Sequence, residues 1–391
     1  MRAMARRSKR DVAIVATGQT DHRSKRPDVN IVEMINEAVR RCLADANLTM
    51  KEIDAVVIGN MEHFEGIFFT EMWSADAAGS FLKHGMKITT GGTTGSSLAQ
   101  AGYYHVASGL FDTVMTIGWE KQSEGETTAG LIFQADPLWE RATMSGAIGS
   151  FAGSATAYMH KYGITEEQAA KVAVKNRRNA INNPHAHLKM DLTVEQVLSS
   201  KMLAYPIKML DMCPTSDGAC AMIFASEQKA KKICTNPAWV ITAVTRHDQP
   251  FGGDLEMVMN LRTLRSATEE AYRIAGIKDP LRDFDVAELY EPCTFAELSW
   301  YEATAFCGPG EGGKLMDSGA TQMDGELPVN PSGGVLSTNC IGATAMIRVA
   351  EAAIQVMGKG GKRQVPNVNR AMATGFGGSW WADVMILSKT P

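Results

Sequence analysis

The fold of this 391-residue chain is decided by the stretch Ile88-Thr-Thr-Gly-Gly-Thr-Thr-Gly-Ser-Ser-Leu-Ala-Gln-Ala101. In it the glycine pair Gly91-Gly92 is followed by a polar turn and by a run with apolar residues at helical spacing. We predict a helix over 96–107 that ends at Gly109, because glycine commonly terminates helices. The N-terminus of such a helix carries partial positive charge. The turn is therefore a candidate site for binding a polarised or anionic group.

Strand-like and helical segments alternate on both sides of this turn. In the first part we predict strands over 11–17, 54–59 and 112–118, and a helix over 30–46. In the second part we predict strands over 239–244, 284–289, 370–374 and 382–387, and helices over 257–275 and 343–357. This alternation indicates βαβ units and a mostly parallel sheet, which is an α/β fold.

The glycine turn has a counterpart further along the chain. Gly333-Gly334 is also followed by a polar turn, an alanine-rich helix and a terminating glycine, Gly358. The repeat suggests an internal duplication whose two halves direct both helix N-termini toward one shared cavity. We expect an N-terminal half of residues 11–120 and 213–235, an inserted helical cap of residues 121–212, and a C-terminal half of residues 236–391. Within the insertion, Thr165-Glu-Glu-Gln168 predicts a capping box.

Composition and charge exclude several classes of protein. The formal net charge of −4 argues against nucleic acid as a major partner. No stretch approaches the roughly 18 apolar residues of a membrane span, and the basic first ten residues lack the apolar segment of a signal peptide. The seven cysteines are scattered and include no Cys-x-x-Cys pair, so we expect neither a disulfide framework nor a metal site. A reducing cytoplasm fits best.

Four further segments resemble, in order, the signature stretches of sterol-carrier-type members of the thiolase superfamily. They are Leu210–Phe224, Ala287–Leu298, Pro328–Ala343 and Met372–Ser379. The glycine turn resembles the loop where thiolases carry a nucleophilic cysteine at the start of a buried helix. The resemblance covers nearly the whole chain. It implies a thiolase fold, in which duplicated βαβαβαββ halves form a five-layered αβαβα core, usually as a homodimer acting on acyl-CoA thioesters.

Several signature positions hold other residues in this chain. Gly92 stands at the position of the nucleophilic cysteine, and Ala373 at that of the second cysteine. The histidine of the middle stretch is Tyr290, followed by Glu291 where aspartate is common. The Gly-His-Pro stretch reads Thr338-Asn339-Cys340, with Cys340 at either the histidine or the proline position. These changes resemble a branch of archaeal and bacterial thiolase-like proteins that work with a small zinc-finger, OB-fold (DUF35) subunit. Steroid side-chain aldolases and benzoylsuccinyl-CoA thiolases are similar to it.

Claisen-type chemistry needs a group that attacks or activates a carbonyl, donors for the enolate oxygen, and a proton shuttle. Asn339 can donate an amide N–H to a thioester oxygen at any pH, which suits an oxyanion hole. The alternative is a turn asparagine that satisfies the backbone. Tyr290 and Glu291 end an apolar strand, where α/β enzymes place working side chains. The tyrosine could donate a proton and a desolvated glutamate could act as base, or the pair is a packed tyrosine beside a surface carboxylate.

Sulfur and imidazole groups supply the remaining candidates. Cys340 is the best candidate for a displaced nucleophile, because it precedes the helix predicted over 343–357, whose N-terminus favours a thiolate. Cys293, at the other turn, is a candidate nucleophile for the same reason. Either cysteine could instead be a small buried thiol. His63 is a candidate proton shuttle, unless it is satisfied locally. The backbone expected to bind the CoA thioester belongs to Gly92, Thr93, Gly95, Gly377 and Gly378.

The resemblance and these residues lead to one preferred function and two alternatives. We expect an enzyme that makes or cleaves the C–C bond of a bulky 3-oxoacyl-CoA, with CoA as acyl acceptor and no covalently bound cofactor. Zinc is expected only in the partner subunit. The first alternative is retro-aldol cleavage of a 3-hydroxyacyl-CoA, prompted by Gly92 and Tyr290. The second is a catalytically silent scaffold subunit.

Overall fold

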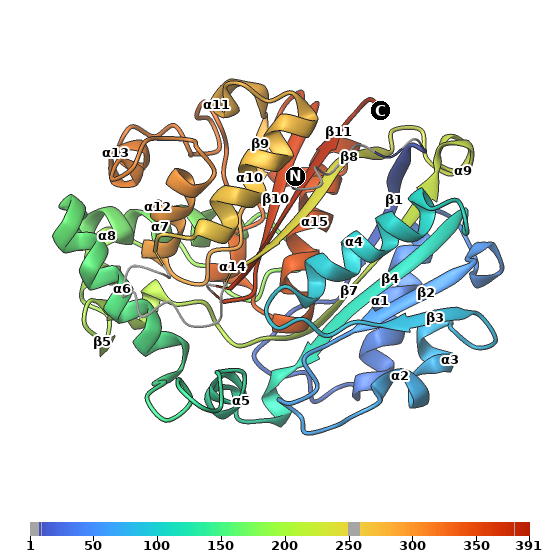
Figure 1. Ribbon diagram of the computed structural model, residues 1–391, viewed down its shortest axis with the longest axis horizontal. Helices are drawn as coiled ribbons and strands as arrows, with labels where there is room; N and C mark the ends of the chain where they lie inside the picture. The colour runs from blue at the N-terminus through green and yellow to red at the C-terminus, as the bar shows by residue number, and fades with distance from the viewer. Residues whose placement is uncertain (1–7, 9, 249–258, 379) are drawn as a thin grey trace.

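The computed structural model describes residues 8, 10–248, 259–378 and 380–391 (Figure 1). Residues 257 and 258, where the predicted helix 257–275 would begin, lie outside the described residues. Within the described residues, one mixed sheet has the strand order β3-β2-β4-β7-β1-β8-β11-β10-β9. The prediction of a mostly parallel sheet is wrong, because three neighbouring pairs are parallel and five are antiparallel. Its strands are β1 (Val12–Gln19), β2 (Ala55–Gly59), β3 (His84–Lys87), β4 (Thr113–Lys121), β7 (Asp217–Ser226), β8 (Ala238–His247), β9 (Val286–Glu288), β10 (Arg370–Phe376) and β11 (Trp381–Ser388).

The same strand order occurs twice. In the first half the order is β3-β2-β4-β7-β1, with two parallel pairings followed by two antiparallel ones. In the second half, the chain at Val329 forms a parallel bridge to Ala287 in β9, and the order continues β9-β10-β11-β8 with the same pairing directions. A short antiparallel pairing of β1 with β8 joins the halves. The predicted duplication into βαβαβαββ halves is confirmed.

Helices follow the strands in both halves. In the first half they are α1 (Ile31–Asp45), α2 (Thr70–Trp73), α3 (Ala75–Ala78), α4 (Thr94–Ala107) and α9 (Glu227–Ile233), with a 3-10 turn at Met50–Glu52. In the second half they are α10 (Arg262–Ala275), α11 (Pro280–Asp283), α12 (Thr294–Ala303), α13 (Gly312–Asp317), α14 (Gly334–Ser337) and α15 (Ile341–Met357), with a 3-10 turn at Gly361–Arg363. In the part of the chain that the structure describes, no helix combines the length and apolarity needed to cross a bilayer.

Alternate residues of the strands face two different helix layers. On β7, Ile223 packs in the core that contains α1, whereas Met222 packs in the core that contains α4 and α15. Helix α4 packs mainly on the first half of the sheet, α15 packs on strands of both halves, and the two helices pack against each other in the middle of the molecule (Figure 1). Helix α10 packs on β8 and β11. The succession α1, sheet, α4 with α15, sheet, α10 is the predicted five-layered αβαβα core.

A glycine lets the two central helices approach closely at their N-terminal turns. A Cβ atom at Gly95 would lie 2.4 Å from the backbone nitrogen of Met346 in α15. Real Cβ atoms do not come so close to backbone, so only glycine fits at this crossing. The crossing brings the N-terminal parts of α4 and α15 together in the middle of the molecule.

The residues between β4 and β7 form a largely helical layer at one end of the molecule (Figure 1). Its elements are α5 (Thr127–Phe133), α6 (Gly146–Tyr162), α7 (Glu166–Ala180), α8 (Val194–Leu198), β5 (Met202–Ala204) and β6 (Ile207–Lys208), with 3-10 turns at Gln122–Glu124 and Met209–Asp211. The predicted capping box is confirmed, since the Thr165 side chain accepts a hydrogen bond from the backbone N–H of Gln168. The division of the chain into domains at 120/121, 212/213 and 235/236 stays a prediction.

Candidate functional site

Four loops meet where α4 and α15 begin. Phe376, at the end of β10, joins two of them, because its carbonyl lies against Gly92 and its ring centroid lies 6.1 Å from that of Tyr290. Tyr290 follows β9 and is hydrogen-bonded to Thr344 in the first turn of α15. The Thr344 hydroxyl donates to Asn339 Oδ1 at 3.0 Å. The loops at Gly92, Tyr290, Asn339 and Phe376 therefore come together, as the sequence led us to expect.

The Asn339 side chain is held between two other side chains. Its Oδ1 accepts from Thr344, and its Nδ2 donates to Cys213 Sγ at 3.3 Å. Its backbone N–H donates to Ser216 Oγ at 3.2 Å, and only 7% of the residue is exposed. The hydrogen bonds of the Asn339 side-chain amide are thus made with other side chains of the site, and not with the backbone of its own turn. This geometry is compatible with the predicted oxyanion role, which stays a prediction.

Cys213 is a member of the site that the sequence alone does not single out. It lies in the loop before β7, is partly exposed, and its backbone N–H donates to Pro292 O at 3.0 Å. Burial of the sulfur raises the pKa of Cys213 to about 12, while the nearby Arg177 guanidinium opposes this rise. Cys213 belongs to one of the thiolase-like segments, Leu210–Phe224, but no helix N-terminus or adjacent base marks it in the sequence.

Cys340 is the N-cap residue of α15 and is fully buried. Its Sγ lies 3.3 Å from His22 Nδ1, beneath Gly218, where a Cβ atom would be 2.8 Å from the sulfur. Burial and the carboxylates of Asp217 and Glu120 raise the pKa of Cys340 well above that of an ordinary thiol. Burial also lowers the pKa of His22 well below its usual value. The two groups therefore form a neutral pair, and the predicted nucleophilic role of Cys340 stays a prediction.

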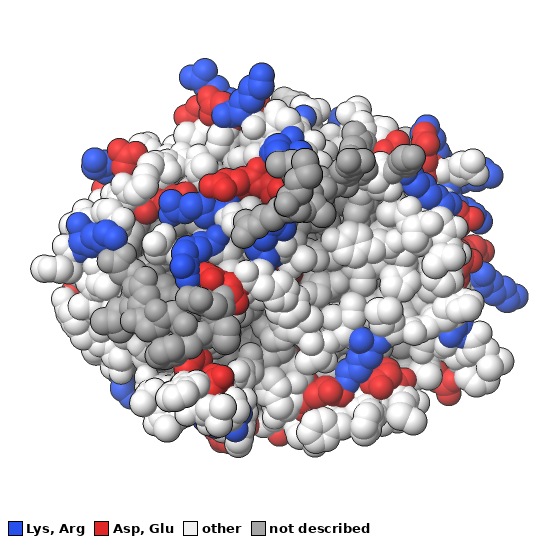
Figure 2. Space-filling view, in the orientation of Figure 1, with Lys and Arg blue, Asp and Glu red and all other residues white. Residues whose placement is uncertain are grey.

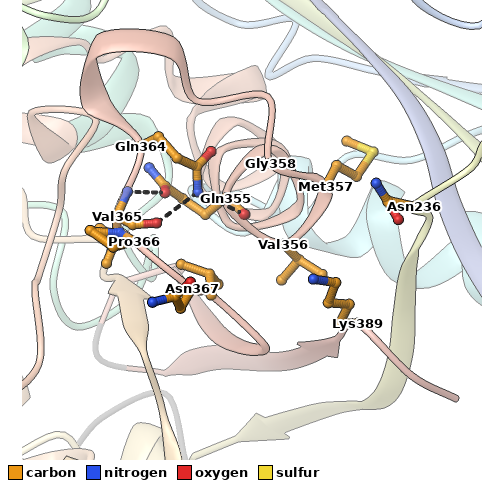
Figure 3. Close-up of a pocket in the computed structure, with 11 residues that line it drawn as sticks. Asn236, Gln355, Val356, Met357, Gly358, Gln364, Val365, Pro366, Asn367 and Lys389 are labelled. Carbon is orange, nitrogen blue, oxygen red and sulfur yellow. Dashed lines mark hydrogen bonds between the residues drawn. The ribbon is translucent and has the colours of Figure 1, made fainter.

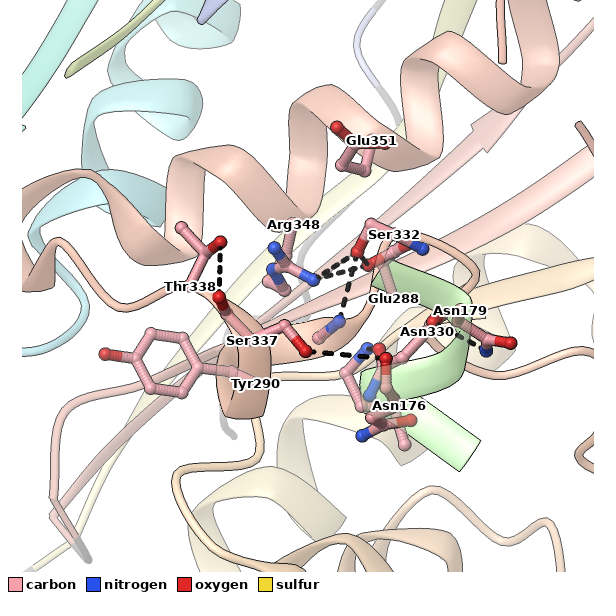
Figure 4. A network of polar contacts seen from close by, with 12 residues as sticks. Asn176, Asn179, Glu288, Tyr290, Asn330, Ser332, Ser337, Thr338, Arg348 and Glu351 are labelled. Atoms are coloured by element: carbon pink, nitrogen blue, oxygen red, sulfur yellow. Dashed lines mark hydrogen bonds and ion pairs between the residues drawn. The ribbon is translucent and has the colours of Figure 1, made fainter. Parts of the chain in front are cut away.

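Glu291 extends into a buried polar network that lies away from the Tyr290 ring. Its Oε1 accepts hydrogen bonds from Asn176 Nδ2 at 3.1 Å and from the Leu336 backbone N–H at 3.2 Å. Asn176 also donates to Glu297 Oε2 at 2.6 Å. Figure 4 shows the Tyr290 ring pointing away from Asn176 and the rest of this network. Burial and the nearby Glu297 charge raise the pKa of Glu291 well above its usual value, which favours the protonated form of its carboxyl group.

Two buried ion pairs hold the same network in place. Lys175 Nζ lies 2.5 Å from Glu297 Oε1, and both side chains are fully buried. Arg348 of α15 lies 2.6 Å from Glu288 Oε2 at the end of β9 (Figure 4). Burial raises the pKa of Glu288 to about 7, although Arg348 opposes this shift. One pair ties α7 to α12, and the other ties β9 to α15.

Replacing Glu291 by glutamine is expected to make the protein more stable at neutral pH. Above the unfolded pKa, near 4.5, the unfolded chain releases the Glu291 proton while the folded chain keeps it. Stability of the wild type therefore falls by up to about 1.4 kcal/mol for each pH unit until the folded pKa is reached. Glutamine cannot ionise, so the difference in Tm between Glu291→Gln and wild type should grow from pH 4.5 to pH 7. Thermal unfolding across this range checks the expectation.

A matched variant separates this effect from the general loss of a buried carboxylate. Glu297→Gln leaves Lys175 buried without its partner, and we expect it to lower Tm at every pH. A Glu291→Gln protein that is less stable than wild type at pH 7 would show that Glu291 is ionised in the folded protein.

Two predicted catalytic residues lie beside the site rather than in it. Cys293 is the N-cap residue of α12 and is fully buried, and burial raises its pKa although backbone N–H groups of α12 hydrogen-bond to it. His63 Nε2 lies 3.3 Å from Gln134 Nε2, and burial lowers its pKa. Gln134 in turn lies near Gly91, where a Cβ atom would be 3.4 Å from Gln134 Oε1. The catalytic roles of Cys293 and His63 stay predictions.

The residues predicted to bind the CoA thioester fall into two groups. Thr93 and Gly377 are neighbours, because a Cβ atom at Gly377 would lie 2.9 Å from Thr93 Oγ1. Gly92 and Gly378 belong to the same two loops, with Gly378 at a φ of +69°. Gly95 differs, since it is buried in the crossing of α4 with α15. CoA binding by all five residues stays a prediction; Gly92, Gly377 and Gly378 are partly exposed, whereas Thr93 and Gly95 are buried.

A cavity of about 240 Å³ opens at the opposite end of α15 (Figure 3). It is lined by residues that include Met357, Gly358, Gln364 and Lys389. Because Asn339 and Cys340 precede the first turn of α15, this cavity is separate from the site described above. Among the described residues, no three histidine, cysteine, aspartate or glutamate side chains lie together in a way that could hold a metal ion.

Comparisons with known proteins agree with this architecture. The chain matches the family models "Thiolase, N-terminal domain" over residues 12–228 and "Thiolase C-terminal domain-like" over residues 253–389. It is 32% identical over 376 residues to acetyl-CoA acetyltransferase of Methanothermobacter thermautotrophicus, covering 95% of this chain and 97% of that protein. It is 32% identical over 273 residues to benzoylsuccinyl-CoA thiolase subunit BbsB of Thauera aromatica, covering 69% and 70%. A solved Ltp2-ChsH2(DUF35) aldolase has a similar fold, with a TM-score of 0.83, 23% identity and 97% coverage of both chains.

Proposed function

Since this chain belongs to the thiolase family, we propose that it makes or cleaves the C–C bond of a 3-oxoacyl-CoA, with CoA as the acyl acceptor. The observation that carries the proposal is the convergence of Tyr290, Asn339 and Cys213 beside the Gly92 turn. These polar groups come from three separate segments and are linked by Thr344 and by the Asn339 amide. The relative BbsB supports a bulky acyl group as the substrate class.

Each group fits one part of the reaction. In the cleavage direction the C2–C3 bond breaks, and its electron pair forms the enolate of the departing thioester. Asn339 donates its amide N–H to a thioester or enolate oxygen, and the start of α4 adds positive potential from the other loop. Tyr290 donates a proton to the carbanion carbon or to its oxygen. The products are two acyl-CoA thioesters from one 3-oxoacyl-CoA and one CoA.

Turnover of defined substrates tests the proposal. The purified protein is incubated with CoA and a series of aliphatic and aromatic 3-oxoacyl-CoAs, and the thioester products are separated and weighed by mass spectrometry. We expect two acyl-CoA products, with the highest kcat/KM for a bulky acyl group. Tight CoA binding without turnover of any substrate would contradict the proposal and favour the silent scaffold.

A retro-aldol reaction is a second candidate because Gly92 supplies no sulfur and a protein of similar fold is an aldolase. That reaction converts a 3-hydroxyacyl-CoA into an acyl-CoA and a carbonyl compound and consumes no CoA. The same assay distinguishes the two, since formation of an aldehyde or ketone without added CoA would identify the aldolase.

We propose a small zinc-finger, OB-fold subunit of the DUF35 class as a partner, with zinc only in that subunit. The support is the fold neighbour, which is a complex with a DUF35 chain. All seven cysteines are free thiols in the structure, which favours a reducing compartment such as the cytoplasm. Affinity purification from the native source, followed by mass spectrometry and zinc analysis of any small partner, tests this assignment.

We also propose that two copies of the chain pair through the edge strand β3. Three of its four residues are exposed, and it is at the edge of the sheet. Figure 2 shows a broad area without charged side chains over the neighbouring α4. The exposed apolar residues of β3, α4 and the segments flanking them, here called the β3 surface, are Phe81, Leu82, Met86, Tyr104 and Leu110. An unpaired edge next to such a surface is typical of a protein interface.

Met86→Lys is expected to convert a dimer into a monomer. The substitution places a charge in the middle of an apolar interface, at a side chain that is 48% exposed in the single chain. Light scattering coupled to gel filtration measures the mass. Met209→Lys, at a methionine that is 51% exposed in the insertion, is the control and should stay dimeric. A monomeric wild type, or a dimeric Met86→Lys protein, would contradict the interface.

A further inference from the structure

If the chain is a thiolase, it needs a sulfur to carry the acyl group, and Gly92 has none. Three cysteines lie near the meeting point of the loops: Cys213, Cys293 and Cys340. Cys293 and Cys340 are fully buried, whereas Cys213 is partly exposed. Cys213 Sγ also accepts a hydrogen bond from the Asn339 side-chain amide, and it lies close enough to Tyr290 for the two groups to interact electrostatically. Of the three, only Cys213 is both partly exposed and hydrogen-bonded to a group proposed to act, Asn339.

A buried cation lies next to Cys213. Arg177 of α7 is only 1% exposed, and its Nη2 donates to the carbonyl of Met212 at 3.1 Å. Its Nε and Nη1 groups have no hydrogen-bond partner, and the described residues include no ion pair with it. Among the described residues, Glu291 is the carboxyl group that acts electrostatically on Arg177, and burial raises the pKa of Glu291, which favours its neutral form. A buried guanidinium without a counter-ion is costly, and an anion that formed beside it would be stabilised.

We propose that Cys213 attacks the substrate as a thiolate that is paired with Arg177 and hydrogen-bonded by Asn339, and then carries the acyl group as a thioester. The inference rests on the proposed thiolase function and adds the identity of the nucleophile. Arg177 is a positioning residue in this scheme, because it acts through the sulfur, whereas Asn339 serves both the sulfur and the substrate oxygen.

The covalent step balances without any further reactant. Cys213 Sγ attacks C3 of the 3-oxoacyl-CoA, the C2–C3 bond breaks, and its electron pair goes to C2. The thiol proton passes through the Tyr290 hydroxyl to C2, which releases a shortened acyl-CoA and leaves a thioester on Cys213. The thiol of CoA then attacks this thioester, forms the second acyl-CoA and returns a proton to Cys213.

Formation of the Cys213 thiolate depends on the charge of Arg177. Burial favours the resting thiol by raising the pKa of Cys213 to about 12, and Arg177 and Asn339 both lower that pKa. Alkylation of Cys213 by iodoacetamide should therefore accelerate with rising pH, because only the thiolate reacts. Arg177→Gln should slow alkylation at every pH below 12, whereas Arg177→Lys keeps the charge and should retain most of the rate.

Trapping the acyl group tests the proposal. The protein is mixed with a 3-oxoacyl-CoA in the absence of CoA, quenched in acid, digested and analysed by mass spectrometry. We expect the acyl mass on the peptide that contains Cys213, and a loss of thiolysis in Cys213→Ala of about a thousandfold or more. Cys234→Ala, at a partly exposed cysteine at the end of α9, is the control and should keep full activity.

Other outcomes separate this inference from the proposed function. Acylation of Cys340 or Cys293, or full thiolysis by Cys213→Ala, would overturn the role of Cys213 and leave the thiolase function standing. Absence of turnover with every 3-oxoacyl-CoA would overturn the proposed function itself. The alkylation series does not depend on turnover, and equal rates for wild type and Arg177→Gln would overturn the thiolate–guanidinium pair.

Discussion

Tyr290→Phe is expected to lower kcat for C–C bond cleavage by about 10²–10⁴-fold, the usual contribution of a positioned proton donor. The substitution removes one hydroxyl, which is hydrogen-bonded to Thr344 at the start of α15. The ring is retained, so its contact with Phe376 and the convergence of the loops should persist. Burial holds the pKa of Tyr290 far above neutrality, so the hydroxyl is protonated and able to donate throughout the physiological pH range.

The measurement is steady-state turnover of the best 3-oxoacyl-CoA, with Tm recorded for each variant. Tyr205→Phe, which removes a hydroxyl from a side chain that is 60% exposed in the insertion, is the matched control and should behave like wild type. A Tyr290→Phe protein with unchanged kcat would remove Tyr290 from the reaction. Loss of kcat together with a large fall in Tm would instead indicate a structural role for the hydroxyl.

Most of the fold could be predicted because its signals are local. The buried strand β2 (Ala55–Gly59) follows from an unbroken apolar run, and α15 follows from alanine-rich sequence that ends at Gly358. Strand β3 was missed because His84-Gly-Met-Lys87 is mostly exposed and has no apolar alternation. The chain at Val329 was missed as a sheet neighbour for a similar reason, since a single bridge to Ala287 leaves no periodic pattern.

The site could be predicted only in outline, because its contacts join distant parts of the chain. Asn339 contacts Cys213, which lies 126 positions away in the sequence, and Cys340 contacts His22, which lies 318 positions away. The resemblance to thiolases identified the loops but not these pairs. The sequence also did not show which way Glu291 points. Neighbouring residues at a strand end point to opposite sides, but the sequence does not say which of the two faces the site. Tyr290 therefore faces Phe376 while Glu291 enters the buried network, and the alternative of a surface carboxylate does not occur.

Gly92→Cys, which places a cysteine where thiolases have their nucleophile, is expected to destabilise this protein without restoring a thiolase cysteine. A Cβ atom at Gly92 would lie 2.4 Å from the carbonyl oxygen of Phe376. This oxygen belongs to the backbone at the end of β10, and the Phe376 ring is packed against Phe151, Tyr290 and Trp300. No flexible side chain can move aside, so we expect a loss of about 1–3 kcal/mol in the free energy of unfolding.

Chemical denaturation measures this loss, and Gly92→Ala is the matched variant because it adds the same Cβ atom without sulfur. Equal destabilisation of the two variants would assign the cost to the Cβ contact with Phe376. We expect no gain in thiolysis from Gly92→Cys, because relieving the contact must displace the loop that also holds Tyr290. A Gly92→Cys protein that is as stable as wild type and more active would show that the loop yields readily. In that case this chain would differ from thiolases at position 92 by one side chain only, and the backbone around the site would be unchanged.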